Sequence, residues 1–284
     1  MSLLKSAVKK EYIAAIKKLR LIDDTFFSIC FDDNIECMQL ILRLFFNRND
    51  IIVKQVVTQR SAQNLYGRGV RFDVLAVDSK DKLYNCEVQR ADEGAIAKRA
   101  RYNSSMLDSR ETAKGIPFEQ LPETWVIFIT ENDVFGANLP LYHVERIITE
   151  LNKAFDDAAH ILYVNSTYQD NSALGLLMHD FFCTDPAKMH YKELARRADY
   201  FKAETKGVNT MCEIMEQLQA EGRAEGRSQM AIDIAIDMLR DNKPLDEIAK
   251  YSRLPLERIQ ELASTLPKDN IKNTYWSIEL QIID

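Results

Sequence analysis

The fold of this chain is decided by the stretch Phe72-Asp73-Val74-Leu75-Ala76-Val77-Asp78-Ser79-Lys80-Asp81-Lys82-Leu83-Tyr84-Asn85-Cys86-Glu87-Val88-Gln89. It contains two apolar runs rich in β-forming residues, and the polar segment between them is typical of a turn. We therefore predict a β-hairpin with its turn centred on Lys80. In that register Asp73 faces Glu87, with Cβ atoms about 5 Å apart.

Two carboxylates that face each other on a sheet repel, and a divalent cation removes the repulsion because hard cations bind carboxylate oxygens. Side chains alternate along a strand, so Gln89 shares a face with Glu87, while Val88 points the other way and can offer its backbone carbonyl. The sequence thus predicts a Mg²⁺ site, which Mn²⁺ could also fill, formed by both acids and the Val88 carbonyl. The alternative is a surface hairpin whose acids are solvated or paired with Arg71 and Lys82.

Further segments follow the hairpin in a characteristic order. Arg-x-Asp-Val on one strand and Glu-x-Gln on the next precede a helix with Arg99, Arg101, Tyr102 and Ser105. In this order the chain resembles the PD-(D/E)XK nuclease superfamily, and within it the Rpn family of recombination-promoting nucleases, also described as PD-(D/E)XK nuclease family transposases. The resemblance extends from about residue 21 to residue 225. It includes Asp23-Asp24-Thr25-Phe26-Phe27, Leu121-Pro122-Glu123-Thr124-Trp125-Val126-Ile127-Phe128-Ile129-Thr130, Leu177-Met178-His179-Asp180-Phe181 and Tyr200-Phe201-Lys202.

This resemblance implies an α/β fold with a restriction-endonuclease-like core, in which helices flank a central mixed sheet, followed by a helical C-terminal region. It also implies that Asp73, Glu87 and Gln89 are catalytic. In many such nucleases the helix before the core sheet contributes an acid, so Glu36 is a candidate fourth metal ligand. Its alternative role is that of an acid favoured near a helix N-terminus. The family archetype has lysine where this chain has Gln89, and a neutral amide cannot supply positive charge.

The predicted helix over residues 92–109 carries candidate substrate-binding residues. Arg99 and Tyr102 are three apart and lie on one face, where they could hold a phosphate together with the nearby Arg101. The alternative is a solvated basic face. We interpret the four histidines, at positions 143, 160, 179 and 190, as structural because none is paired at a spacing typical of metal ligands.

The net charge of −6 and the pI near 5.4 argue against a protein that simply coats nucleic acid. The charge is uneven, however. Residues 43–114 contain 14 Lys and Arg against 9 Asp and Glu, whereas residues 115–284 contain 17 against 28. The basic excess therefore surrounds the hairpin, as a phosphodiester site requires.

The sequence has no apolar run of membrane-spanning length and no signal-peptide core, so we expect a cytoplasmic protein without membrane contact. Its five cysteines are widely spaced within apolar segments, which favours buried thiols over disulfides.

We predict five regions along the chain. They are an N-terminal helix (1–20), a nuclease-like domain (21–190), a helical extension ending in a charged connector (191–228), a small helical module (229–266) and a tail (267–284). The connector repeats Ala-Glu-Gly-Arg and is a hinge candidate. Within the domain we expect strands over 51–58, 124–130 and 159–165 and helices over 33–46 and 143–155, with helices again from residue 173.

The module resembles a helix-turn-helix, but Arg253 stands where the turn usually has glycine, and Glu257 and Glu261 would repel phosphate. We favour packing or dimerisation as the role of this module, and dimerisation would make the protein a homo-oligomer.

The function predicted from these observations is a metal-dependent DNA endonuclease, in recombination or mobile-element biology. A second hypothesis is a catalytically weakened DNA-binding or assembly protein on a nuclease scaffold, which Gln89 and the acidic second half would allow. A third is an α/β protein whose match to the motif is accidental.

Overall fold

The computed structural model describes residues 2–62, 69–90, 92–112, 115 and 117–266; the predicted tail lies outside them. The chain divides into two compact units, Met1–Cys212 and Glu213–Asp284. No helix in the described part of the chain is long and apolar enough to cross a bilayer.

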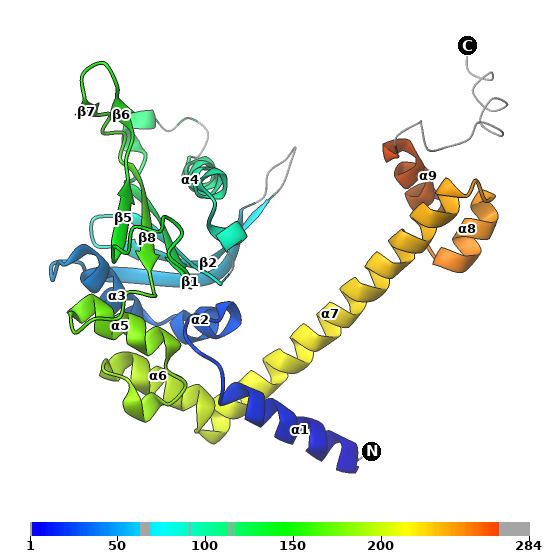
Figure 1. Ribbon diagram of the computed structural model, residues 1–284, viewed down its shortest axis with the longest axis horizontal. Helices are drawn as coiled ribbons and strands as arrows, with labels where there is room; N and C mark the ends of the chain where they lie inside the picture. Colours follow the sequence, from blue (N-terminus) through cyan, green and yellow to red (C-terminus); the bar gives the residue numbers. More distant parts are fainter. Residues whose placement is uncertain (1, 63–68, 91, 113–114, 116, 267–284) are drawn as a thin grey trace. The chain divides into compact units, whose positions relative to one another are not determined.

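The first unit is built on a six-stranded mixed sheet (Figure 1). The neighbouring strands β3, β4 and β8 run parallel, and the remaining pairings are antiparallel. The predicted central mixed sheet is therefore confirmed. In spatial order the strands are β1 (Val53–Ala62), β2 (Val70–Asp78), β3 (Leu83–Gln89), β4 (Thr124–Thr130), β8 (Ala159–Asn165) and β5 (Leu141–Val144).

Helices cover both faces of this sheet (Figure 1). On one face α4 packs on β4 and β8, and its Ala100 and Leu107 share a core with Val126, Phe128 and Tyr163. On the other face α2 and α3 pack against β1, and α2 also contacts β2 and β3. The helices of this unit are α1 (Ser2–Ile16), α2 (Asp24–Phe31), α3 (Ile35–Phe46), α4 (Ala97–Glu111), α5 (Ala173–Phe182) and α6 (Lys192–Lys202), with short 3₁₀ turns η1 (Asp92–Ala95), η2 (Phe118–Gln120) and η3 (Pro186–Lys188).

The hairpin has the predicted register. Val74 pairs with Cys86 and Val77 with Leu83, which centres the turn on Lys80. Asp78 holds this turn closed, because its Oδ1 accepts backbone hydrogen bonds from Lys80 and Lys82 at 2.8 and 3.0 Å. The register is thus specified by a turn that the sequence encodes locally and by alternation of apolar residues.

The prediction of a helix over residues 143–155 is wrong. The segment contains the end of β5 and a small two-stranded sheet, β6 (Ile147–Ile148) with β7 (Lys153–Ala154). The apolar spacing imitates a helical stripe, but Ile147, Leu151 and Phe155 are exposed and meet no core. Between the two strands Asn152 adopts a left-handed backbone conformation, with φ of 46°, which ends any helix.

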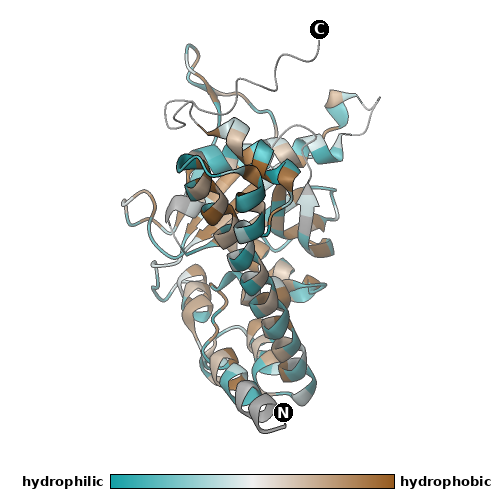
Figure 2. Cartoon of the chain, turned by 90° about the vertical axis from the view of Figure 1, so that its right-hand side faces the viewer, coloured by the Kyte–Doolittle hydropathy of each residue, from teal (hydrophilic) through white to brown (hydrophobic). Residues whose placement is uncertain are grey.

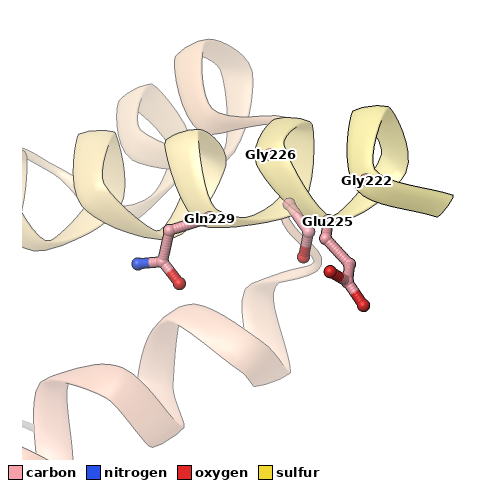
Figure 3. Close-up of a pocket in the computed structure, with 5 residues that line it drawn as sticks. Gly222, Glu225, Gly226 and Gln229 are labelled. Carbon is pink, nitrogen blue, oxygen red and sulfur yellow. The ribbon is translucent and has the colours of Figure 1, made fainter. Parts of the chain in front are cut away.

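The charged connector, predicted as a hinge candidate, is helical. A single helix, α7 (Thr205–Arg240), runs through it without interruption. Two interior glycines cost about 1 kcal/mol each, but Ala, Glu, Gln and Arg around them are strong helix formers. Figure 3 shows Glu225 and Gln229 projecting from α7 beside Gly222 and Gly226, where they line a hollow together with Ser228.

The second unit ends in a small core of its own. Ala235 and Leu239 of α7 are buried with Ile248 of α8 (Leu245–Ser252) and Ile259 of α9 (Leu256–Thr265). Figure 2 shows hydrophobic and hydrophilic residues side by side on these helices, as expected when one face packs inward. Arg253 joins α8 to α9 in the left-handed conformation, with φ of 61°, that glycine would adopt more easily.

Candidate functional site

Asp73 and Glu87 come from adjacent antiparallel strands, one step beyond the paired residues Val74 and Cys86. Burial raises the pKa of both carboxyl groups. For Asp73 the charge of Glu87 is the next largest cause, while a hydrogen bond from the Val88 backbone amide opposes the rise. The two acids therefore interact directly through space, as the predicted register requires.

Glu87 lies at the centre of the site and is 0% exposed. Its Oε1 accepts a hydrogen bond from Asn85 Nδ2 at 3.1 Å, and its Oε2 accepts one from Arg99 Nη2 at 3.2 Å. Asn85 is two residues earlier on β3 and equally buried, and its own Oδ1 has no hydrogen-bond partner. A buried acceptor of this kind is usually satisfied by a bound water or ion.

Gln89 is held at the rim of the site by the same guanidinium. Arg99 Nη1 donates to Gln89 Oε1 at 3.1 Å. Gly94 makes room for this arrangement, since a Cβ there would lie 1.9 Å from Gln89 Oε1. Arg99 thus places a positive charge next to the position where the family archetype carries lysine.

Asp24 is a third acid at the site. It is the first residue of α2, and its charge raises the pKa of both Asp73 and Glu87. Burial raises the pKa of Asp24 itself, while Arg71 and Arg99 lower it. We did not predict this residue, although it belongs to one of the segments that carry the family resemblance. Only long-range packing of α2 against the hairpin reveals its role.

The residues present fit a hard divalent cation. Asp73 and Glu87 have raised pKa values because burial makes their negative charge unfavourable, and Asp24 adds its charge from an exposed position at the start of α2. Carboxylate oxygens are the ligands that Mg²⁺ and Mn²⁺ prefer, and Mg²⁺ in particular retains several waters. The Val88 side chain is buried, at 3% exposure. Its carbonyl stays a predicted ligand.

The structure does not bring every candidate residue to this cluster. Glu36 lies on an exposed part of α3 and pairs with Arg196 at 2.7 Å. Arg101 is exposed on α4, two residues from Arg99 and so on another side of the helix. Tyr102 is partly buried and packs against the core beneath α4.

A closed ring of ion pairs borders the site. Arg20 and Arg90 each pair with both Asp23 and Glu131, at distances from 3.1 to 3.4 Å. Asp23 precedes Asp24, and Arg90 follows Gln89. The ring therefore ties the start of α2 to the carboxyl ends of β3 and β4, where the acids converge.

The six-stranded mixed sheet, the acids on adjacent strands and the helix that carries Arg99 define an α/β fold of the PD-(D/E)XK type. Residues 34–170 match the family model described as PD-(D/E)XK nuclease family transposase, so the resemblance indicated by the sequence is confirmed over this segment. The segment includes the hairpin and α4 but not Asp24. No curated protein and no solved structure matches the chain significantly.

Proposed function

We propose that this protein is a metal-dependent DNA endonuclease that hydrolyses phosphodiester bonds in recombination or mobile-element biology. The family match supports a nuclease or transposase-related role. The observation that supports hydrolysis most strongly is the pair of interacting carboxyl groups on β2 and β3, whose pKa values are raised and which lie beside an arginine. Carboxyl groups with strongly perturbed pKa values are concentrated at functional sites.

In this proposal Asp73 and Glu87 hold Mg²⁺ together with the Val88 carbonyl, and Asp24 contributes further negative charge. A bound Mg²⁺ lowers the pKa of a coordinated water and offsets the charge of the phosphate. Asn85 keeps the Glu87 carboxylate in one orientation through its hydrogen bond to Oε1. The Gln89 amide orients the attacking water or a phosphate oxygen.

Arg99 and its helix bind the substrate. The Arg99 side chain is 41% exposed although it contacts buried Glu87, so the guanidinium can reach a phosphate from the site. Arg101 is exposed on another side of α4, where it contacts a phosphate farther along the DNA backbone, and Tyr102 fixes the helix on the core. The basic excess over residues 43–114 attracts the polyanion to this part of the surface.

Cleavage of supercoiled plasmid by purified protein tests the proposal. We expect nicking with Mg²⁺ or Mn²⁺, none with chelator or Ca²⁺, and loss of most activity in Asp73→Ala and Glu87→Ala. Glu150→Ala is the matched control, because Glu150 is an exposed acid in the turn between β6 and β7. Equal cleavage by wild type and both site variants would show that a contaminant is responsible.

A catalytically weakened DNA-binding or assembly protein is the second candidate, and Gln89 in the place of lysine favours it. Deleting residues 229–284 removes the entire small core around Ile248 and Ile259. If the chain acts through this unit, the deletion will abolish assembly or DNA binding, and the full chain will bind DNA without cleaving it in any metal. Metal-dependent cleavage by the deleted chain would reject this candidate.

A further inference from the structure

A second group of potential metal ligands lies outside the segment that matches the family. His179 and Asp180 are on α5, and His190 lies between η3 and α6. Each offers one ligand atom, and these atoms all lie within 4.8 Å of one another. The two imidazole rings meet edge to face, with centroids 4.8 Å apart. The spacing of these histidines in the sequence did not reveal that they meet.

The fold builds this group around a buried carboxylate. Asp180 is 0% exposed, and its two oxygens accept hydrogen bonds from the backbone amides of His190 and Tyr191 at 2.8 to 2.9 Å. Tyr191 directly precedes α6 and provides no side-chain cap. Asp180 therefore satisfies amide groups at the start of α6 and at the same time holds His190 beside α5.

The same carboxylate also orients the first imidazole. His179 Nδ1 lies 3.2 Å from Asp180 Oδ1. This is about the separation of two ligand atoms on one tetrahedral Zn²⁺, so a single cation can contact both atoms. The His179 side chain is 42% exposed and His190 is exposed as well, so a cation from solvent can reach both rings.

The charge and chemistry of the group select the metal. Among the described residues the ion-pair partner of Asp180 is His179, so the group is anionic when both imidazoles are neutral. Two imidazoles with one carboxylate suit Zn²⁺ far better than Mg²⁺. Bonds of about 2.0–2.1 Å to a tetrahedral Zn²⁺ require ligand atoms closer than 4.8 Å, which the exposed rings achieve by rotation about their side-chain bonds.

We propose that His179, Asp180 and His190 form a Zn²⁺ site that fastens α5 to the start of α6. Solvent completes the coordination shell at the exposed side. The site is separate in sequence and in ligand chemistry from the carboxylate site of the hairpin, and it does not depend on nuclease activity.

Zinc titration of the full-length protein tests this site. Calorimetry and competition with a chromophoric chelator measure the binding. An excess of Mg²⁺ is present throughout to occupy the carboxylate site. Wild type is expected to bind one Zn²⁺ per chain in the micromolar range or tighter. His179→Ala and His190→Ala are each expected to weaken binding about tenfold or more. His143→Ala is the matched control, since it removes an exposed imidazole on β5, and Glu87→Ala should also bind Zn²⁺ normally.

Thermal unfolding is the second measurement, because it remains informative if a variant folds poorly. Zn²⁺ should raise the Tm of wild type and of His143→Ala but not that of His190→Ala, whose substitution lies in a loop. Absence of Zn²⁺ binding by wild type, or equal affinity in the histidine variants and the control, would overturn the proposal. Loss of binding in Glu87→Ala alone would assign the zinc to the nuclease site instead.

Discussion

Arg99 on α4 and Glu87 on β3 form an ion pair across the border between the core and solvent, with Arg99 Nη2 at 3.2 Å from Glu87 Oε2. Glu87 is fully buried, whereas the Arg99 side chain is 41% exposed. The guanidinium also holds Gln89 and thereby links the acid site to the surface at which DNA would arrive.

The first prediction concerns this arginine. Arg99→Ala should reduce single-turnover cleavage by about 100-fold or more at saturating DNA, as loss of one hydrogen-bond donor to a transition state typically does. Arg99→Lys should retain part of the activity, because an ammonium supplies charge but cannot hold Glu87 and Gln89 at once.

Arg101→Ala provides the comparison. As a change at an exposed phosphate contact, it should weaken DNA binding and flatten its salt dependence while the saturated rate stays near that of wild type. An Arg99→Ala protein that cleaves at the wild-type rate would remove Arg99 from the mechanism.

The second prediction concerns pH and stability without metal. Burial raises the folded-state pKa of Asp73 and Glu87, so above the unfolded values of 3.8 and 4.5 the folded protein binds more protons than the unfolded chain. The contribution of these acids to the free energy of unfolding therefore decreases as the pH rises from the pKa values of the unfolded chain toward the raised pKa values of the folded protein. Added Mg²⁺ should reverse the loss.

Asp73→Asn should consequently raise the free energy of unfolding by roughly 1–2 kcal/mol at neutral pH in chelator, while it removes stabilisation by Mg²⁺. Urea unfolding between about pH 5 and pH 8 measures both effects. Glu150→Gln should change neither. A metal-free Asp73→Asn protein less stable than wild type would contradict the assignment of unfavourable charge to this pair.

The third prediction compares two glycines of α7. A Cβ at Gly226 meets nothing within 4 Å, whereas one at Gly207 would lie 2.0 Å from the Tyr200 carbonyl oxygen. Gly226→Ala should therefore stabilise the helix by about 1 kcal/mol, and Gly207→Ala should destabilise the protein. Thermal unfolding followed by circular dichroism distinguishes them. If Gly226→Ala destabilised the protein, Gly226 would be needed for something other than the packing of this chain.

The fourth prediction separates two candidate acids from helices. Asp24→Asn should weaken the Mg²⁺ dependence of cleavage, because Asp24 interacts electrostatically with both hairpin acids. Glu36→Gln should leave cleavage unchanged, since Glu36 pairs with Arg196 on the surface. Metal titration of the cleavage rate provides the measurement. The reverse pattern would restore Glu36 as the ligand.

Local pattern was sufficient for much of the fold. The hairpin register followed from alternation and from a turn that Asp78 closes, and the strand predicted over residues 124–130 matches β4 residue for residue. Such elements are determined by contacts within a few residues. Residues 143–155 were misassigned because exposed apolar side chains can imitate a helical period without any core to face.

The sequence by itself therefore determined the resemblance to PD-(D/E)XK nuclease family transposases, the mixed α/β core and the register of the hairpin that carries Asp73 and Glu87. Tertiary structure alone decided that Asp24 joins these acids, that Arg99 turns inward to Glu87 while Glu36 turns away to Arg196, and that His179 meets His190. The physical reason is the range of the interactions. Strand pairing across a short turn is encoded locally, whereas the convergence of charged groups depends on how whole helices pack on the sheet.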